Sequence, residues 1–328
     1  MVKFPSFAPR PPWLTGDLQT LRNILRQPFH DLSAWPEERV EVPLPDGDRL
    51  LAQIHRPEKA RAVTVLIHGL SGCADSLYVR ATAQYLLQRS HAVIRLNLRG
   101  AAATSSPVRA LYHAGRSEDI REALTALHQR FPSLPRFAVG YSLGGNMLLK
   151  YLAEEGKAAP LAAAVTVSVP LDLAACSVRL RARRNRVYEQ YLISRLRADT
   201  LARVAGLSDS ERRAIAAARS VLAFDEAFVA PRNGFADAAD YYTRSSAARF
   251  LSGIATPTLV VHALDDPWIP AEVYRTVPWG DLPVLTPLLS KGGGHVGFHA
   301  ADSRVPWHDR CLAQFLDSKT LLDPLSNG

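Results

Sequence analysis

A serine in a glycine-rich turn is the residue of this chain best suited to chemistry. Ser142 lies in the pentapeptide Gly-Tyr-Ser-Leu-Gly, which runs from Gly140 to Gly144. An apolar stretch at residues 136–139 precedes it, and a helical pattern follows. A turn from strand to helix holds such a serine in a strained conformation that exposes its hydroxyl, and the glycines avoid clashes with both elements. We therefore predict that Ser142 is a nucleophile.

A serine hydroxyl is a weak nucleophile and needs a neighbouring base. His295 follows three consecutive glycines, directly after the last predicted strand, residues 283–288. Catalytic groups gather at the carboxyl edge of open α/β sheets, and glycines allow a loop to turn tightly enough to aim a side chain. His299 is the nearest alternative, but we expect it to begin a helix. The sequence thus favours His295 as the base.

The base must itself be oriented, and two adjacent carboxylates are available for this role. Asp265 and Asp266 follow the predicted strand at residues 257–262. Neighbouring side chains in a tight turn point in different directions, so only one of them can meet the imidazole. We favour Asp266 because it stands four residues before Pro270, the usual Asp-x-x-x-Pro spacing of such an acid. We expect Asp265 to cap the turn.

Attack on a carbonyl also requires two N–H groups that stabilise the developing oxyanion, each worth about 3 kcal/mol. One donor is the residue after the nucleophile, Leu143. The other comes from the loop after an early strand, residues 62–67, which is followed by His68, Gly69 and Leu70. We predict the amides of Leu70 and Leu143 as the donors, and we expect His68 to brace the loop rather than to act as a second base.

The elements that would position these residues alternate along the chain. After a predicted antiparallel hairpin at residues 38–44 and 50–56, near-continuous apolar strands alternate with helical segments. This pattern predicts an α/β fold, a mostly parallel sheet covered by helices on both faces. The predicted strands are 62–67, 92–98, 136–139, 162–169, 257–262 and 283–288, and the clearest helices are 76–88, 117–131 and 305–316.

The organisation of the chain divides it into four regions. Residues 1–36 read as an N-terminal arm with a short helix, and residues 37–171 and 251–322 as the α/β core. Between the two parts of the core, residues 172–250 are helical, polar and rich in arginine. We interpret this stretch as a helical cap insertion over the carboxyl edge of the sheet, and residues 323–328 as a C-terminal tail.

Composition limits the class of protein. The chain has 328 residues, of which 47% are hydrophobic and 21% charged, as in ordinary soluble globular proteins. It contains neither an apolar run of 18 residues nor a secretory signal pattern. Three widely separated cysteines argue against a disulfide framework and a zinc site and suit a reducing cytoplasm. We expect a cytoplasmic location, without a metal or an organic cofactor.

The net charge of +8 comes from arginine, and many of these arginines lie between residues 179 and 197. This run favours a solvated helical face, with peripheral contact to an anionic membrane as the alternative. The arginines are not interleaved with aromatic residues in the manner of a nucleic-acid-binding module, so we do not expect nucleic acid as a partner. The oligomeric state cannot be predicted from these features.

Taken together, the motifs resemble those of the YheT-like α/β-hydrolases, a family that includes bacterial proteins classed as esterases and eukaryotic membrane-associated lipases. The similarity covers nearly the whole chain. It is carried by residues 68–70, 98–100, 112–115, 140–146, 169–173, 185–188, 234–242, 265–267 and 293–298.

The resemblance implies the α/β-hydrolase fold and a serine esterase or lipase whose catalytic triad corresponds to Ser142, Asp266 and His295. The substrate would be a small ester or lipid, with short- to medium-chain acyl esters or acylglycerol-like lipids as the expected class. Two alternatives remain: an acyltransferase that moves the acyl group to an alcohol and, less favoured, a non-catalytic protein that binds a lipid surface.

The chain departs from the family pattern in two places. The family's N-terminal Gly-His-x-Gln-Thr motif has Asp17 in place of its histidine, and residues 101–106 replace a small loop that contains cysteine and glycine. The second difference concerns the substrate pocket. A His-x-x-x-x-Asp motif credited with acyl transfer is matched only weakly, because His113 has Glu118 at that spacing and Asp119 one residue further on.

Overall fold

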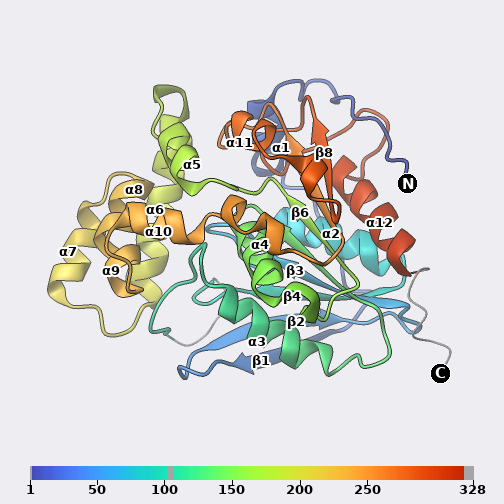
Figure 1. Cartoon of the computed structure of the whole chain (residues 1–328), viewed down its shortest axis with the longest axis horizontal. Coiled ribbons are helices and arrows are strands. Elements are labelled where there is room, and N and C mark those ends of the chain that lie inside the picture. Colours follow the sequence, from blue (N-terminus) through green and yellow to red (C-terminus); the bar gives the residue numbers. More distant parts are fainter. Residues whose placement is uncertain (1, 102–106, 321–328) are drawn as a thin grey trace.

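The computed structural model describes residues 2–101 and 107–320. Within these residues, eight strands form one sheet in the order β1-β2-β4-β3-β5-β6-β7-β8 (Figure 1). β1 and β2 form the predicted antiparallel hairpin, β2 is also antiparallel to β4, and the other neighbours are parallel. The mostly parallel sheet is therefore confirmed. The strands are β1 Glu37–Pro43, β2 Arg49–His55, β3 Ala62–Ile67, β4 His91–Asn97, β5 Arg136–Tyr141, β6 Ala163–Val167, β7 Thr258–Ala263 and β8 Leu285–Ser290.

The parallel register brings the loops after the strands to one edge of the sheet. Ile67 at the end of β3 pairs with Gly140 of β5, and Gly140 pairs with Thr166 of β6. β7 and β8 continue in the same direction. The four loops that carry the predicted site residues, after β3, β5, β7 and β8, therefore start from the same edge.

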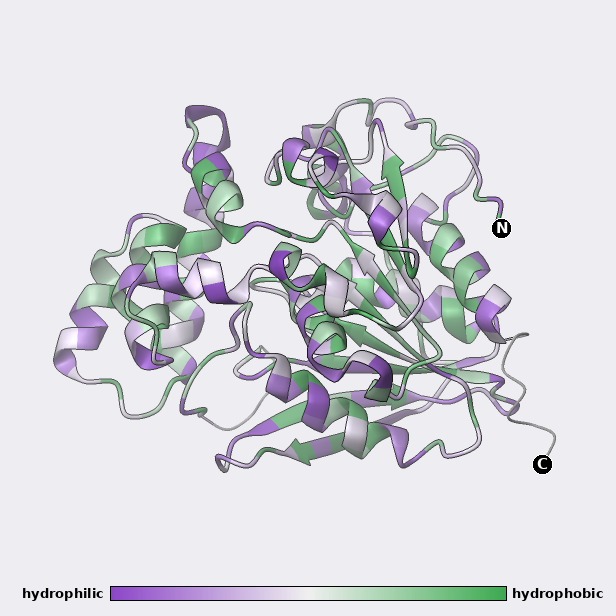
Figure 2. Ribbon diagram, viewed as in Figure 1, coloured by the Kyte–Doolittle hydropathy of each residue, from purple (hydrophilic) through white to green (hydrophobic). Residues whose placement is uncertain are grey.

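Helices cover both faces of the sheet because its central strands are apolar on both sides. Along β3, Val65 belongs to the cluster formed with α3 and α4, whereas Leu66 belongs to the cluster formed with α2 and α12. Figure 2 shows mainly hydrophobic residues along these central strands. The four helices are α2 Leu77–Leu87, α3 Ser117–His128, α4 Leu143–Glu155 and α12 Trp307–Thr320.

The segment between β6 and β7 is helical, as predicted, and lies to one side of the sheet (Figure 1, left). Its buried residues Leu192 and Phe224 belong to the same apolar cluster as Leu148 of α4, so this segment packs onto the core. The segment contains α5 Leu173–Leu180, η2 Arg183–Asn185, α6 Arg186–Arg203, α7 Asp209–Ala217, α8 Val221–Phe224, η3 Asp225–Val229, α9 Ala230–Arg232, α10 Ala238–Ser245, η4 Ala247–Arg249 and η5 Leu251–Gly253.

The N-terminal segment is closely attached to the end of the chain. α1, Gly16–Arg26, is capped by Thr15, whose side chain accepts a hydrogen bond from the amide of Leu18. Before it, Phe7 makes edge-on contacts with Phe298 and with Trp307, and residue 9 forms a β-bridge with residue 300. Among the residues described here, no helix is both long and apolar enough to cross a bilayer.

The sequence prediction for His299 is wrong: this residue does not begin a helix, and the last helix starts at Trp307. The amide of His299 donates to Oε1 of Gln19, and its carbonyl oxygen accepts from the amide of Arg10. The N-terminal segment thus satisfies backbone groups that a helix would have used.

The short α11, Glu272–Arg275, and η6, Trp279–Asp281, lie between β7 and β8, and η1, Gly156–Ala158, follows α4.

The division into arm, core, cap and tail stays a prediction. The proposed tail, residues 323–328, and most of the loop that departs from the family pattern, residues 102–106, lie outside the described residues.

Candidate active site

The turn between β5 and α4 has the geometry expected for an exposed nucleophile. Ser142 has φ 49° and ψ −122°, a conformation that is rare and costly for a residue with a side chain. The backbone fixes it, because the Ser142 amide donates to the carbonyl of Val167 over 2.9 Å. A Cβ atom at Gly144 would lie 2.2 Å from the carbonyl oxygen of His68, so only glycine fits there. The strained turn is therefore held by its neighbours.

The structure brings together the three side chains predicted as nucleophile, acid and base. Nε2 of His295 lies 3.0 Å from Oγ of Ser142, and its Nδ1 lies 2.8 Å from Oδ2 of Asp266. These residues come from the loops after β8, β5 and β7. Since a carboxylate can only accept, Nδ1 carries the proton and Nε2 is free to accept the serine hydroxyl proton.

Asp266 is held in its charged form by its hydrogen-bond partners. Burial alone would raise the pKa of this carboxyl, but the charge of His295 and the hydrogen bond from it, with a smaller contribution from the amide of Trp268, lower the pKa below its ordinary value. Its Oδ1 accepts from the amides of Trp268 and Ile269 at 2.8 and 3.2 Å. The carboxylate is thus fixed in position and in charge.

The adjacent carboxyl has a different partner. Oδ1 of Asp265 accepts from the amide of Gly294 at 2.9 Å, and burial raises the pKa of Asp265. Gly293 and Gly294 have φ values of 140° and 60°, which favour glycine. Asp265 therefore holds the loop of the histidine, a contact across 29 residues in place of the local turn cap that the sequence suggested.

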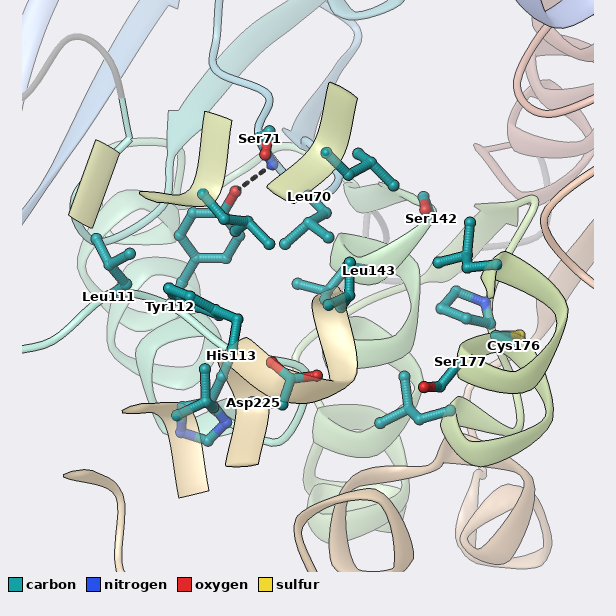
Figure 3. A pocket seen from close by; sticks show the side chains of 18 of the residues that line it. Leu70, Ser71, Leu111, Tyr112, His113, Ser142, Leu143, Cys176, Ser177 and Asp225 are labelled. Carbon is teal, nitrogen blue, oxygen red and sulfur yellow. Dashed lines mark hydrogen bonds between the residues drawn. The ribbon is translucent and has the colours of Figure 1, made fainter. Parts of the chain in front are cut away.

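The two predicted oxyanion donors are free to bind a ligand. In the described part of the chain, neither the amide of Leu70 nor that of Leu143 has a hydrogen-bond partner. Both residues line the same cavity as Ser142 (Figure 3). His68 lies beneath this loop: its Nε2 accepts from the amide of Leu98, its Nδ1 lies 2.8 Å from the carbonyl oxygen of Gly69, and burial lowers its pKa to about 4. It is therefore neutral and anchors the loop.

The cavity extends from the nucleophile into the helical segment. Its wall near Ser142 includes Trp268, whose ring lies over His295 with the centroids 4.2 Å apart. Farther from Ser142, residues of α5, α6, α8, η3 and α10 line the cavity (Figure 3). The lining is mainly aliphatic and aromatic: Leu173, Leu180, Leu192, Leu196, Val221, Phe224, Val229 and Tyr241 are examples. An apolar chain bound here would have one end at the nucleophile.

Sequence reasoning missed the contribution of α1 to the site. Oγ1 of Thr20 accepts from the amide of His295 at 2.8 Å, and Gln19 bonds both the amide and the carbonyl of His299. Both residues belong to the N-terminal motif that carries Asp17, so the signal was present. Asp17 itself accepts from the hydroxyl of Tyr188 at 3.0 Å and links α1 to α6.

The motif around His113 does not form a dyad. Asp119 accepts two hydrogen bonds from the guanidinium of Arg99, at 2.7 and 3.0 Å, and Glu118 is exposed beside Arg116. No hydrogen bond joins either carboxylate to His113 in residues 107–320. The weak resemblance to an acyl-transfer motif therefore gains no support from the geometry.

Metal-binding chemistry finds no candidate among the described residues. None of them form a group of three or more histidine, cysteine, aspartate or glutamate side chains that could hold a metal ion. Cys73, Cys176 and Cys311 are free thiols.

Comparisons with known proteins agree with this geometry. The family described as alpha/beta hydrolase fold matches residues 63–302. "Putative esterase YheT" of Escherichia coli (strain K12) is 36% identical over 293 residues, which cover 84% of this chain and 85% of that protein. "Monoacylglycerol lipase" of Saccharomyces cerevisiae is 29% identical over 79% of this chain and 60% of its own length. The structure of the Pyrococcus furiosus esterase Pf2001 superposes with a TM-score of 0.59 over 98% of both chains at 14% identity, a similarity of fold.

Proposed function

This chain belongs to the alpha/beta hydrolase fold family and, within it, to the YheT-like hydrolases, and we propose that it cleaves carboxylic esters through an acyl-enzyme on Ser142. The observation that carries the proposal is the continuous hydrogen-bonded path from Oγ of Ser142 through His295 to Asp266. Such a path makes an alcohol oxygen reactive at neutral pH.

In the first half-reaction, Oγ of Ser142 attacks the ester carbonyl while Nε2 of His295 takes the hydroxyl proton. The carbonyl oxygen becomes an oxyanion and accepts from the amides of Leu70 and Leu143. The C–O bond to the alcohol then breaks, and His295 returns the proton to the leaving oxygen. Asp266 keeps the imidazole oriented and stabilises the positive charge that the ring carries after it has taken the proton.

In the second half-reaction, His295 removes a proton from water, and the resulting hydroxide attacks the acyl carbonyl. The bond between the acyl carbon and Oγ breaks, Oγ regains the proton, and a free acid leaves. An alcohol that replaces water at this step would instead give a new ester, which is how acyl transfer would occur at the same site.

The cavity supports a substrate with an apolar chain. Its wall in the helical segment consists mainly of aliphatic and aromatic side chains, among them Leu192, Leu196 and Phe224. Burying each methylene of a chain contributes about 0.8 kcal/mol. We therefore propose short- to medium-chain acyl esters or acylglycerol-like lipids as the substrate class.

Product analysis tests this proposal. The purified protein is incubated with p-nitrophenyl esters from acetate to palmitate, with and without added ethanol or glycerol. Hydrolysis predicts free acid as the main product and an optimum at short to medium chain length, while Ser142→Ala retains no turnover above background. A predominance of transfer product would favour the acyltransferase alternative, and turnover by Ser142→Ala would overturn the mechanism.

Peripheral contact with an anionic membrane is also proposed. All exposed large hydrophobic residues of the described chain lie in two segments, 14–29 and 178–191. The carboxylate of Asp17 connects the two segments, because it accepts hydrogen bonds from Arg184 and Tyr188. The members are Leu14, Leu18, Ile24, Leu25, Phe29, Val178, Val187 and Tyr191. The arginine run overlaps the second segment, and exposed apolar groups beside arginines suit an anionic lipid surface.

Vesicle co-sedimentation tests the membrane contact. We expect binding to phosphatidylglycerol vesicles at low salt, weaker binding at high salt, and little binding to phosphatidylcholine vesicles. Val187→Ser should weaken binding without a loss of folding, since this side chain is 80% exposed. Equal binding to both kinds of vesicle, or no binding to phosphatidylglycerol vesicles at low salt, would contradict the proposed membrane contact. A cytoplasmic location stays a prediction.

A further inference from the structure

The helical segment contributes two acidic side chains to the cavity, Asp199 and Asp225, and the proposed mechanism uses neither. Asp225 follows α8 and starts η3, a single π-helical turn. It is 8% exposed and lines the same cavity as Ser142 and His295. Figure 3 shows its carboxyl group directed toward the space that Leu70 and Leu143 also line. A carboxyl group in such an apolar enclosure requires a physical explanation.

The protein satisfies only one of the two oxygens of this carboxyl group. Oδ2 of Asp225 accepts from the hydroxyl of Tyr242 at 2.7 Å, and this hydroxyl lies 3.4 Å from Oγ of Ser177. Oδ1 has no hydrogen-bond or ion-pair partner among residues 2–101 and 107–320. No lysine or arginine lines the described wall of the cavity. The carboxyl group thus has a free acceptor oxygen next to the bound substrate.

The other carboxyl group on the cavity wall has a partner. Asp199 of α6 forms an ion pair with Arg203 at 3.4 Å, one turn along the same helix. Within the described part of the chain Asp225 has no comparable cation, and its facing groups are the phenols of Tyr241 and Tyr242. A polar atom that a bound ligand closes off from solvent without a partner costs about 1–3 kcal/mol, so a ligand that supplies a donor to Oδ1 of Asp225 is favoured over one that does not.

We propose that Asp225 binds an alcohol hydroxyl of the substrate and so selects hydroxyl-bearing esters over plain alkyl esters of the same size. This inference rests on the proposed function for its substrate, an ester held at Ser142. The hydroxyl could stand on the alcohol part, as in a glycerol ester, or on the acyl chain.

A hydroxyl fits the surroundings better than a cation does. Burial raises the pKa of Asp225 to about 7, against the hydrogen bond from Tyr242, so the protonated and ionised forms coexist near neutral pH. A hydroxyl can donate to the carboxylate or accept from the acid, and it therefore binds both forms. A cation would bind only the ionised form.

Binding of uncleavable ethers tests the proposal without any need for turnover. The probes are octyl propyl ether, 1-O-octylglycerol, and the ether with a hydroxyl at the far end of the octyl chain. Their dissociation constants are measured by calorimetry with the wild type and with Asp225→Leu and Asp225→Asn. Tyr242→Phe is the matched control because it leaves the free oxygen in place, and the melting temperature of each variant checks folding.

The expected result is that one of the hydroxylated ethers binds the wild type about 10- to 100-fold more tightly than octyl propyl ether does. Asp225→Leu should abolish this advantage and bind the plain ether at least as well, Asp225→Asn should keep part of it, and Tyr242→Phe should keep most of it. Which ether gains identifies the side of the ester that carries the hydroxyl.

Equal binding of all three ethers to the wild type, or an advantage that survives Asp225→Leu, would overturn the proposal. Such a result would leave the proposed function intact if esters are still cleaved. Conversely, hydroxyl-dependent binding without ester turnover would reject the proposed function and support the assigned site.

Discussion

Asp266 and Asp225 are both buried carboxyl groups at the candidate site, yet burial has opposite outcomes for them. Asp266, at the edge of the sheet, accepts from His295 and from the amides of Trp268 and Ile269, and its pKa is lowered. Asp225, in the helical segment, accepts from Tyr242 and from no other described residue, and burial raises its pKa to about 7. The number of partners, rather than burial, decides whether a carboxyl group is charged here.

The difference separates two kinds of environment in one cavity. The sheet edge supplies strand ends and loop amides that are fixed by the core, so the carboxylate of Asp266 is satisfied before any substrate binds, and the amides of Leu70 and Leu143 are left for the oxyanion. The helical segment uses most of its amides within its own helices and presents mainly side chains, so a carboxyl group without a neighbouring cation, such as Asp225, has a free oxygen for the ligand. The first region suits chemistry, and the second suits selection of a substrate.

The largest expected effect comes from removing the negative charge of Asp266, the carboxylate whose two oxygens both have hydrogen-bond partners. Asp266→Asn should lower kcat/KM for a p-nitrophenyl ester by about 10⁴-fold, because an amide can neither stabilise the imidazolium nor enforce the tautomer. Asp302→Asn is the matched control, since Asp302 is an exposed partner of Arg310. Steady-state kinetics measures both variants. A loss below 10-fold for Asp266→Asn would show that this carboxylate does not orient the base.

The second effect concerns the free energy of unfolding and its pH dependence. The folded state holds the proton of Asp225 up to about pH 7, while the unfolded chain releases it near pH 3.8, so this group makes stability fall as the pH rises between these values. Asp225→Asn lacks this term. It should gain on the order of 2–4 kcal/mol relative to the wild type between pH 4 and pH 8.

Urea unfolding at a series of pH values measures this difference. Since other groups titrate in both proteins, only the difference between variant and wild type is informative. Asp309, whose pKa burial also raises to about 7, should behave alike in the two proteins. A difference in unfolding free energy that does not change with pH would mean that the carboxyl group of Asp225 is not proton-bound near neutrality.

The smallest expected effect concerns the backbone amide of His295, at the sheet edge. Thr20→Val removes the acceptor of the His295 amide with little change in shape. We expect kcat to fall about 10-fold with KM nearly unchanged, because a buried amide left without an acceptor costs about 1–3 kcal/mol and displaces the loop. Thr20→Ser should restore the activity. An unchanged kcat for Thr20→Val would show that α1 does not position the histidine.

The sequence indicates the parts of the molecule that local pattern controls. β3 was predicted at its observed bounds, since an unbroken apolar run leaves little choice for a strand covered on both faces. The strained turn at Ser142 could also be foreseen because its glycines are adjacent in sequence. The choice between Asp265 and Asp266 depended on a spacing to Pro270, and in the structure Asp266 is the one that contacts the imidazole.

Other features lie beyond local pattern because they join distant segments. The bond from the amide of His295 to Thr20 spans 275 residues, and that from the amide of His299 to Gln19 spans 280. The same contacts explain why the prediction of a helix at His299 was wrong, since nothing near it in sequence shows that α1 satisfies its backbone. The free oxygen of Asp225 cannot be predicted from the sequence either, because it depends on how α10 places Tyr242.

The rate of covalent labelling of Ser142 by an alkyl fluorophosphonate tests the central claim most directly. Peptide mass spectrometry should find one adduct per chain, on Ser142, and His295→Ala should slow its formation by at least about 10³-fold, in line with the loss of a general base. Labelling at another residue, or an equal rate in His295→Ala, would contradict the claim that the imidazole activates this serine.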